Sequence, residues 1–184
     1  MGLIRKTNHS ARLFSLLQQI PVPRRALDLG CGDDHEPGEY LASLCARSAN
    51  THSAESQLIG LDQDLSRLRS LHRRKGDWLV QADLTRLPFG TQLTFDLILI
   101  RHPDIDNSRE GWKQAMMAIP GRLSDRGFLL ITSYSVGEME QIHSWLTTPS
   151  LLSYPLALDR LPPPDLAGRD RFVIAYQRIR DDRV

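Results

Sequence analysis

The fold follows from the stretch Ala26-Leu27-Asp28-Leu29-Gly30-Cys31-Gly32. Its first four residues have the apolar character of a short buried strand, and this strand runs directly into a turn with two glycines. Glycine lets the backbone approach a ligand closely, and the amides at the start of a following helix can meet negative charge. The stretch therefore predicts a strand, a ligand-binding turn and a helix in succession.

The rest of the chain alternates apolar runs with helical patterns. We predict further strands at 58–62, 78–83, 95–100, 128–132 and 171–176. Helices are predicted at 9–20, 37–45, 65–71, 108–119 and 135–146, and Ser135 with Glu138 has the capping-box spacing that opens the last of them. Parallel neighbours need crossover connections, so this order indicates an α/β fold, a doubly wound, mostly parallel sheet with helices on both faces. Whether residues 151–158 form a further strand is left open.

Composition sets the class of protein. The 184 residues suit one domain, 1–184, and no apolar run is long enough to span a membrane. Lysine and arginine total 23 against 22 aspartates and glutamates, so the overall charge does not indicate a nucleic-acid-binding protein. Two cysteines, Cys31 and Cys45, cannot build a disulfide framework, and residues 1–10 lack the apolar region of a signal peptide. We expect a cytoplasmic protein without membrane association.

The residues around the glycine turn restrict its ligand. A dinucleotide-binding fingerprint needs a third glycine at position 35, where this chain has His35. Asp28 precedes the turn, and its negative charge disfavours a pyrophosphate but favours a ligand with a cationic group. A nicotinamide-dependent oxidoreductase is therefore disfavoured.

The segment Asp28-Leu29-Gly30-Cys31-Gly32 resembles motif I of the class I S-adenosylmethionine-dependent methyltransferases. Asp62 ends the second strand, where members of this family carry an acid that binds the ribose hydroxyls. Asp83-Leu84 is similar to the residues beside the adenine. Phe95-Asp96-Leu97-Ile98 resembles the opening of the fourth strand, and 123–127 the turn before the fifth. The resemblance covers residues 24–135 in the family's order.

This resemblance implies a Rossmann-like, seven-stranded sheet with abbreviated last strands, and S-adenosylmethionine (S-adenosyl-L-methionine) as the cofactor. It implies cofactor contacts at Asp28, Gly30, Cys31, Gly32, Asp62, Gln63, Asp83, Leu84 and Arg101. Cys31 is expected to be a small packing residue rather than a reactive thiol, and Asp83 has the alternative role of capping the turn at 84–85. Asp28 and Asp62 lie farther apart than the roughly 20 residues expected between such a turn and the ribose acid, which we attribute to a loop at 48–57. The run 33–36 makes the turn acidic.

Residues just past the fourth strand face the reacting methyl in this family, and here they read Arg101-His102-Pro103-Asp104-Ile105-Asp106. Histidine exchanges a proton near neutral pH, so His102 is a predicted catalytic residue. Asp104 can orient it or accept a proton, and Arg101 can pair with a carboxylate or phosphate. The alternative is a strand end solvated by polar side chains. Ser133 and Tyr134 are further candidates for the pocket wall, and no metal site is predicted.

The acceptor is left open by the sequence. The segment at 101–106 lacks the Asn/Asp-Pro-Pro-aromatic motif of amino-group methyltransferases of nucleic acids and the Pro-Cys nucleophile of pyrimidine carbon methyltransferases. The basic stretch 67–75 is interpreted as a solvated helix face, because no aromatic residues are interleaved within it. A small-molecule acceptor is expected, with an oligomer or protein partner as one means of completing the pocket and residues 162–168 as a candidate cover. An RNA methyltransferase and a non-catalytic scaffold or regulatory subunit stay open as alternatives.

Overall fold

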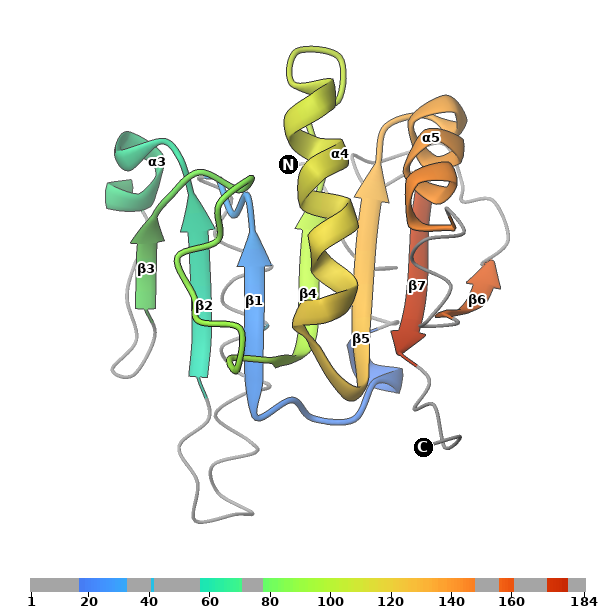
Figure 1. Cartoon of the computed structure of the whole chain (residues 1–184), viewed down its shortest axis with the longest axis horizontal. Helices are drawn as coiled ribbons and strands as arrows, with labels where there is room; N and C mark the ends of the chain where they lie inside the picture. Colours follow the sequence, from blue (N-terminus) through green and yellow to red (C-terminus); the bar gives the residue numbers. More distant parts are fainter. Residues whose placement is uncertain are drawn as a thin grey trace, which may run out of the picture.

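The structure is a computed structural model that describes residues 17–32, 41, 57–70, 78–147, 156–160 and 172–178. A seven-stranded sheet with the order β3-β2-β1-β4-β5-β7-β6 forms its centre (Figure 1). The strands are β1 (Arg25–Leu29), β2 (Gln57–Asp62), β3 (Trp78–Gln81), β4 (Phe95–Arg101), β5 (Leu123–Ser133), β6 (Leu156–Arg160) and β7 (Phe172–Arg178). Neighbours from β3 to β5 are parallel, and β7 is antiparallel to both β5 and β6. The predicted mostly parallel α/β sheet is confirmed.

The central strands are mostly apolar because both faces of the sheet are covered. In β4, Ile98 and Ile100 belong to one apolar cluster, whereas Leu97 and Leu99 belong to a second. Successive side chains of a strand point to opposite faces, so the two clusters are the cores of the two faces. Parallel strands buried on both sides need near-continuous apolar sequence, which is why 95–100 could be recognised as a strand.

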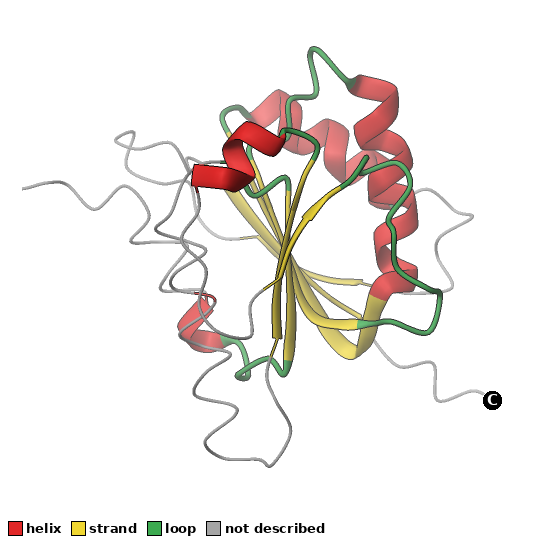
Figure 2. Cartoon of the chain, turned by 90° about the vertical axis from the view of Figure 1, so that its left-hand side faces the viewer, coloured by secondary structure: helices red, strands yellow, loops and turns green. Residues whose placement is uncertain are grey.

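Helices α4 (Arg109–Ala118) and α5 (Val136–Leu146) cover the same face of the sheet, as Figures 1 and 2 show. Trp112 of α4 and Trp145 of α5 pack into the larger cluster there. The helical residues Leu17 and Leu41 pack into the second cluster, on the opposite face. Helical residues on both faces agree with the predicted doubly wound arrangement.

Three predicted helices can be checked directly. Ser135 caps α5: its Oγ accepts from the Glu138 backbone N–H, and the Glu138 carboxylate accepts from the Ser135 N–H, which confirms the predicted capping box. The helix predicted at 65–71 is α3 (Leu65–Ser70). The helix predicted at 108–119 is α4, followed by a 3₁₀ turn at Ile119–Arg122.

None of the helices in the described part of the chain is long and apolar enough to cross a membrane.

The prediction of a turn at 123–127 is wrong, because β5 already begins at Leu123. Phe95 pairs with Leu123 and Leu97 pairs with Phe128, so the intervening residues of β5 form an irregularity within the ladder. Arg126 has a φ of 67° there. A Cβ added at Gly127 would lie 2.8 Å from the Phe95 carbonyl oxygen, so the two backbones approach closely at a position that requires glycine. Polar residues and a glycine signalled a turn, but they mark a bulge.

The lengths of three other strands differ from prediction. β3 ends at Gln81 rather than at 83. The last strands are not abbreviated: β6 has five residues, like β1, and β7 has seven, like β4. β7 lies between β5 and β6 and pairs with both of them, which accounts for its seven residues. The predictions for residues 9–16, 33–40, 42–56, 71–77, 148–155 and 161–171, with Cys45, His35 and the cover at 162–168, lie outside the described residues.

Candidate active site

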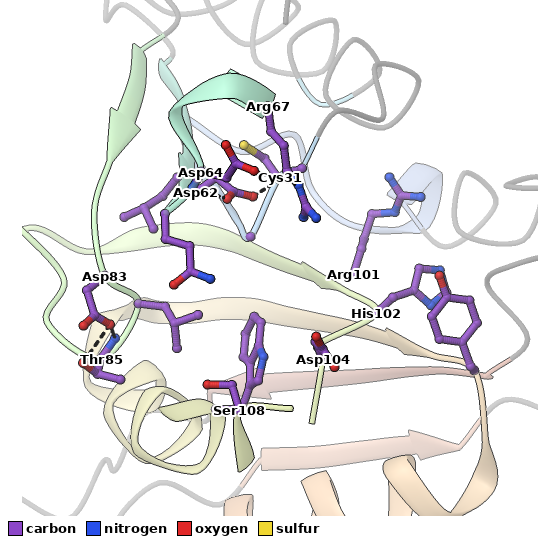
Figure 3. Close-up of a pocket in the computed structure, with 17 residues that line it drawn as sticks. Cys31, Asp62, Asp64, Arg67, Asp83, Thr85, Arg101, His102, Asp104 and Ser108 are labelled. Carbon is purple, nitrogen blue, oxygen red and sulfur yellow. Dashed lines mark hydrogen bonds and ion pairs between the residues drawn. The ribbon is translucent and has the colours of Figure 1, made fainter. Parts of the chain in front are cut away.

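A cavity of about 360 Å³ lies at the carboxyl ends of the parallel strands. This is where doubly wound sheets bind ligands, next to the point where the strand order reverses between β1 and β4. Figure 3 shows the side chains that line it. The lining residues are Gly30, Cys31, Gly32, Leu61, Asp62, Gln63, Asp64, Arg67, Asp83, Leu84, Thr85, Arg101, His102, Asp104, Ser108, Trp112 and Tyr134.

The glycine turn after β1 is held against the end of β2. The Gly30 and Cys31 N–H groups both donate to the Leu61 carbonyl oxygen, at 2.7 and 3.1 Å. Gly30 and Gly32 have φ values of 71° and 61°, in the left-handed region that favours glycine. The turn therefore presents backbone rather than side chains to the cavity at these two positions.

Asp62 is the best-fixed carboxylate of the site. One of its oxygens accepts from the Gly32 N–H at 2.9 Å and the other accepts from the Asp64 N–H at 2.8 Å. The residue is only 5% exposed, yet it lines the cavity. Each carboxylate oxygen has two lone pairs, so both oxygens can still accept a hydroxyl donor from a ligand. Asp62 therefore has acceptor capacity left for a diol, and its role as the ribose acid stays a prediction.

Asp83 lines the cavity and also caps a turn, so its capping role is confirmed, while its contact with the cofactor stays a prediction. Its Oδ1 accepts from the Thr85 N–H and from the Thr85 hydroxyl, each at 2.8 Å. These two hydrogen bonds, the backbone one first, lower the pKa of Asp83. Asp83 is therefore a fixed, ionised acceptor at one end of the cavity.

Cys31 lines the cavity, whereas Asp28 does not. Asp28, predicted as a cofactor contact, is 4% exposed and is not among the lining residues. Burial raises the pKa of the Cys31 thiol, and the charges of Asp28 and Asp62 raise it further. A cysteine that stays protonated is a poor nucleophile, which supports the interpretation of Cys31 as a packing residue. Gly60 of β2 leaves room for it, because an added Cβ would lie 3.3 Å from the Cys31 Sγ.

The end of the cavity beside β4 and β5 contains a stacked aromatic pair, His102 and Tyr134. The rings of His102 and Tyr134 lie 4.0 Å apart between centroids, at an interplanar angle of 21°. His102 has a φ of 46°, which is uncommon for a residue with a side chain, and its N–H donates to the Thr132 carbonyl oxygen. The Tyr134 N–H donates to the Glu138 carboxylate at 2.9 Å. Both backbones are therefore held at neighbouring strand ends.

Two predictions for this end of the cavity differ from the structure. Asp104 was predicted to orient His102 or to accept a proton. Its carboxylate accepts from the Asn107 side chain at 2.9 and 3.0 Å, so the orienting role is wrong, and the role of proton acceptor stays a prediction. Ser133 is fully buried, and its hydroxyl donates to the Ser135 carbonyl oxygen instead of lining the cavity. Short-range partners on the chain satisfy both side chains.

Several lining residues were not predicted. Asp64 and Thr85 follow strand ends by two to four residues, a signal that could have identified them. Arg67 belongs to the stretch interpreted as a solvated helix face, but it lines the cavity and pairs with Asp64 at 3.5 Å. Ser108 and Trp112 come from the start of α4, and the helical spacing of Trp112 indicates only a core residue. Of the predicted cofactor and catalytic residues, Asp28 alone is not brought to the cavity.

Comparisons with known proteins agree with this geometry. No protein-family model matches the chain. Over 93 residues it is 36% identical to a malonyl-[acyl-carrier protein] O-methyltransferase of Legionella pneumophila, a match that covers 48% of this chain. The chain spans only 29% of the length of that curated relative.

Solved structures cover much more of the chain. The N-methyltransferase NodS from Bradyrhizobium japonicum matches 95% of this chain and 99% of its own, with a TM-score of 0.64 and 14% identity. The same enzyme has been solved with S-adenosylhomocysteine. A proposed rRNA methylase from Clostridium thermocellum matches 94% of this chain and 97% of its own, with a TM-score of 0.70 and 12% identity. At such identities the likeness shows a shared fold.

Proposed function

We propose that this chain, which has the class I methyltransferase fold, binds S-adenosylmethionine in the cavity and transfers its methyl group to a small-molecule acceptor. The observation that carries the proposal is the Asp62 carboxylate, which is fixed by two backbone N–H groups beside a bare glycine turn. A diol-binding acid next to exposed backbone fits a nucleoside ligand. S-adenosylhomocysteine bound to NodS, which shares this fold, supports the choice of cofactor.

The lining residues divide into two groups along the cavity. The glycine turn, Asp62 and the turn at 83–85 would hold the cofactor. Arg101, His102 and Tyr134 lie at the ends of β4 and β5, where they would meet the acceptor. Arg67 and Arg101 supply positive charge among four aspartates, so the cavity suits a ligand that carries both charges.

The cofactor supplies an electrophilic methyl group on a sulfonium. Methyl transfer requires the acceptor atom to be aligned with that group, and orientation supplies most of the acceleration. His102 is suited to accept the proton that the acceptor loses, since its backbone is fixed to β5 and its ring is fixed by Tyr134. Asp104, held by Asn107, contributes negative charge rather than a relay through His102.

The first experiment is calorimetric titration of the chain with S-adenosylmethionine and with S-adenosylhomocysteine. We expect micromolar binding, and a loss of about tenfold or more in Asp62→Ala, since one charge-assisted hydrogen bond is worth roughly 1.4 kcal/mol or more. Glu140→Ala removes an exposed carboxylate of α5 as the matched control. Thermal unfolding of each variant separates lost binding from lost folding. Failure of the wild-type chain to bind either compound would contradict the proposal and favour the scaffold alternative.

The acceptor class needs a second measurement. The proposed rRNA methylase among the structural neighbours gives a specific reason to test RNA beside small molecules. An RNA acceptor predicts affinity that falls steeply with salt concentration, because bound phosphates release counterions. We expect methyl transfer to a small molecule with weak salt dependence, and transfer to RNA alone would overturn the choice of acceptor.

A further inference from the structure

Trp112 lies in the first turn of α4, where it packs in the apolar core and also lines the cavity. Most of the side chain is buried in the large apolar cluster between α4, α5 and the sheet, and only 6% of the residue is exposed. It also lines the cavity, together with Ser108 at the start of the same helix. Within the cavity wall it is an apolar, planar surface among mostly charged and polar groups.

The indole is packed directly against the glycine turn. A Cβ added at Gly30 would lie 3.3 Å from the Trp112 Cη2 and 3.7 Å from its Cζ2. Any side chain at position 30 would therefore press on the edge of the six-membered ring, in addition to the strain imposed by the φ of 71°. Gly30 and Trp112 fit each other, so the indole sets how far the turn can move toward α4.

The same turn of α4 also contacts the other loop of the cofactor end. A Cβ added at Gly111 would lie 3.5 Å from the Thr85 Cγ2 and 2.8 Å from the Ser108 Oγ. Thr85 is the residue that fixes Asp83. One helical turn therefore packs against both the glycine turn after β1 and the capped turn after β3.

We infer that Trp112 is a cofactor-positioning residue, whose indole contacts the bound cofactor while it holds the glycine turn in place. The inference rests on the proposed function, because it requires the cofactor to occupy the cavity. Contact between two aromatic rings stabilises a complex beyond simple burial of apolar area. Nothing in the spacing of α4 indicates this role, since Trp112 occupies a core position of the helix.

The chain offers a matched control for the test. Trp145 of α5 is 7% exposed and belongs to the same apolar cluster, but it does not line the cavity. The third tryptophan, Trp78, is 59% exposed on β3. Replacing Trp112 or Trp145 by phenylalanine removes a similar amount of buried ring, so stability alone should respond similarly to both changes.

The experiment measures S-adenosylhomocysteine binding by calorimetry and by intrinsic tryptophan fluorescence. We expect Trp112→Phe to weaken binding by about fivefold, and Trp145→Phe to leave the affinity unchanged. The ligand-induced change in emission should vanish in Trp112→Phe and persist in Trp145→Phe and Trp78→Phe. If Trp112→Phe does not fold, Trp112→Tyr provides the same comparison with a side chain of larger volume.

The outcomes separate this inference from the function on which it rests. Calorimetric binding by the wild-type chain, with an emission change that persists in Trp112→Phe, would overturn the role of Trp112 and leave the cofactor site intact. Equal losses of affinity in Trp112→Phe and Trp145→Phe would overturn it as well, because they would reflect the shared core. Absence of any binding by the wild-type chain would contradict the proposed function itself.

Discussion

Three carboxylates at the cavity share one local pattern. Asp62, Asp64 and Asp83 each accept the backbone N–H of the residue two positions further along the chain, at 2.8 Å. Aspartate favours this short turn because its side chain reaches the second N–H without strain. The three acceptors are thereby fixed by the backbone before any ligand arrives, which reduces the entropy lost on binding.

The Thr85→Val variant tests how the Asp83 carboxylate is stabilised. Loss of the hydroxyl donor should raise the pKa of Asp83 toward its ordinary value, but not all the way, because the Thr85 N–H remains. Since the pKa in the folded chain is lowered, the stabilisation is present above the ordinary value and is lost as the pH falls through the lowered one.

Carboxyl carbon NMR titration measures this change. Asp64 is the internal control, since its pKa is lowered chiefly by the Ser66 hydroxyl and should not move in Thr85→Val. An unchanged Asp83 midpoint in the variant would show that the hydroxyl does not stabilise the carboxylate.

The backbone of His102 gives a prediction about stability. A residue with a side chain pays for the left-handed φ of 46°, whereas glycine does not. We expect His102→Gly to be more stable than His102→Ala by about 1 kcal/mol, although both variants lose the stack with Tyr134. Urea denaturation measures the difference. An alanine variant as stable as the glycine variant would be inconsistent with a left-handed backbone at this position.

At the scale of elements, the start of α5 positions the end of the cavity beside β4 and β5. Its Glu138 carboxylate accepts from the N–H groups of both Ser135 and Tyr134. Tyr134 then stacks on His102, so the start of one helix is linked to the end of β4. A change in the helix cap is therefore expected to alter the positions of Tyr134 and His102 in the cavity wall.

Ser135→Ala should destabilise the chain by about 1 kcal/mol, because it removes the acceptor for the Glu138 N–H. Ser108→Ala is the matched control: Ser108 occupies the same cap position of α4, but its side chain makes no cap hydrogen bond. Thermal unfolding of the two variants compares them. A loss in Ser108→Ala as large as that in Ser135→Ala would contradict the cap as the cause.

Most elements could be predicted because their apolar periodicity is strong. Residues 26–29, 58–62 and 95–100 lie in the buried centre of the sheet, where tertiary packing and local pattern agree. Residues 123–127 could not be assigned correctly, since turn and bulge use the same residue types. The choice between them depends on the distant partner Phe95.

The candidate site was predicted to a similar extent. Strand ends and turns located Gly30, Asp62 and Asp83, because their place in the fold follows from chain order. The partner of Asp104 could not be predicted, since His102 and Asn107 both lie within three residues of it in the sequence. Trp112 was missed because a helix position that faces the core can also reach a cavity at the helix end.

At the scale of the molecule, Asp96 joins distant segments at the end of the sheet away from the cavity. Its carboxylate accepts from the N–H groups of Arg24 and Arg25, at 3.0 and 3.2 Å, and from the Ser124 hydroxyl at 2.6 Å. These contacts bring the starts of β1, β4 and β5 together. Asp96 therefore fixes strand starts in the same way that Asp62 fixes strand ends.

Asp96→Ala should destabilise the chain by about 2–4 kcal/mol, because it leaves three donors without their acceptor. Asp106→Ala removes an exposed carboxylate and is the control. Urea denaturation of both variants checks the prediction. A cost in Asp96→Ala no larger than that in Asp106→Ala would show that water replaces the carboxylate without penalty.

The strand order also determines when the sheet can form as the chain is synthesised. β1, which carries the glycine turn, lies between β2 and β4, and Asp96 bonds to a backbone N–H 72 residues earlier in the chain. A nascent chain that has emerged only as far as β3 has β1 and β2 but lacks β4, so one apolar edge of β1 has no native neighbour. The centre of the sheet can close only after Arg101 leaves the ribosome, and until then the backbone N–H and C=O groups along that edge of β1 lack their native partners.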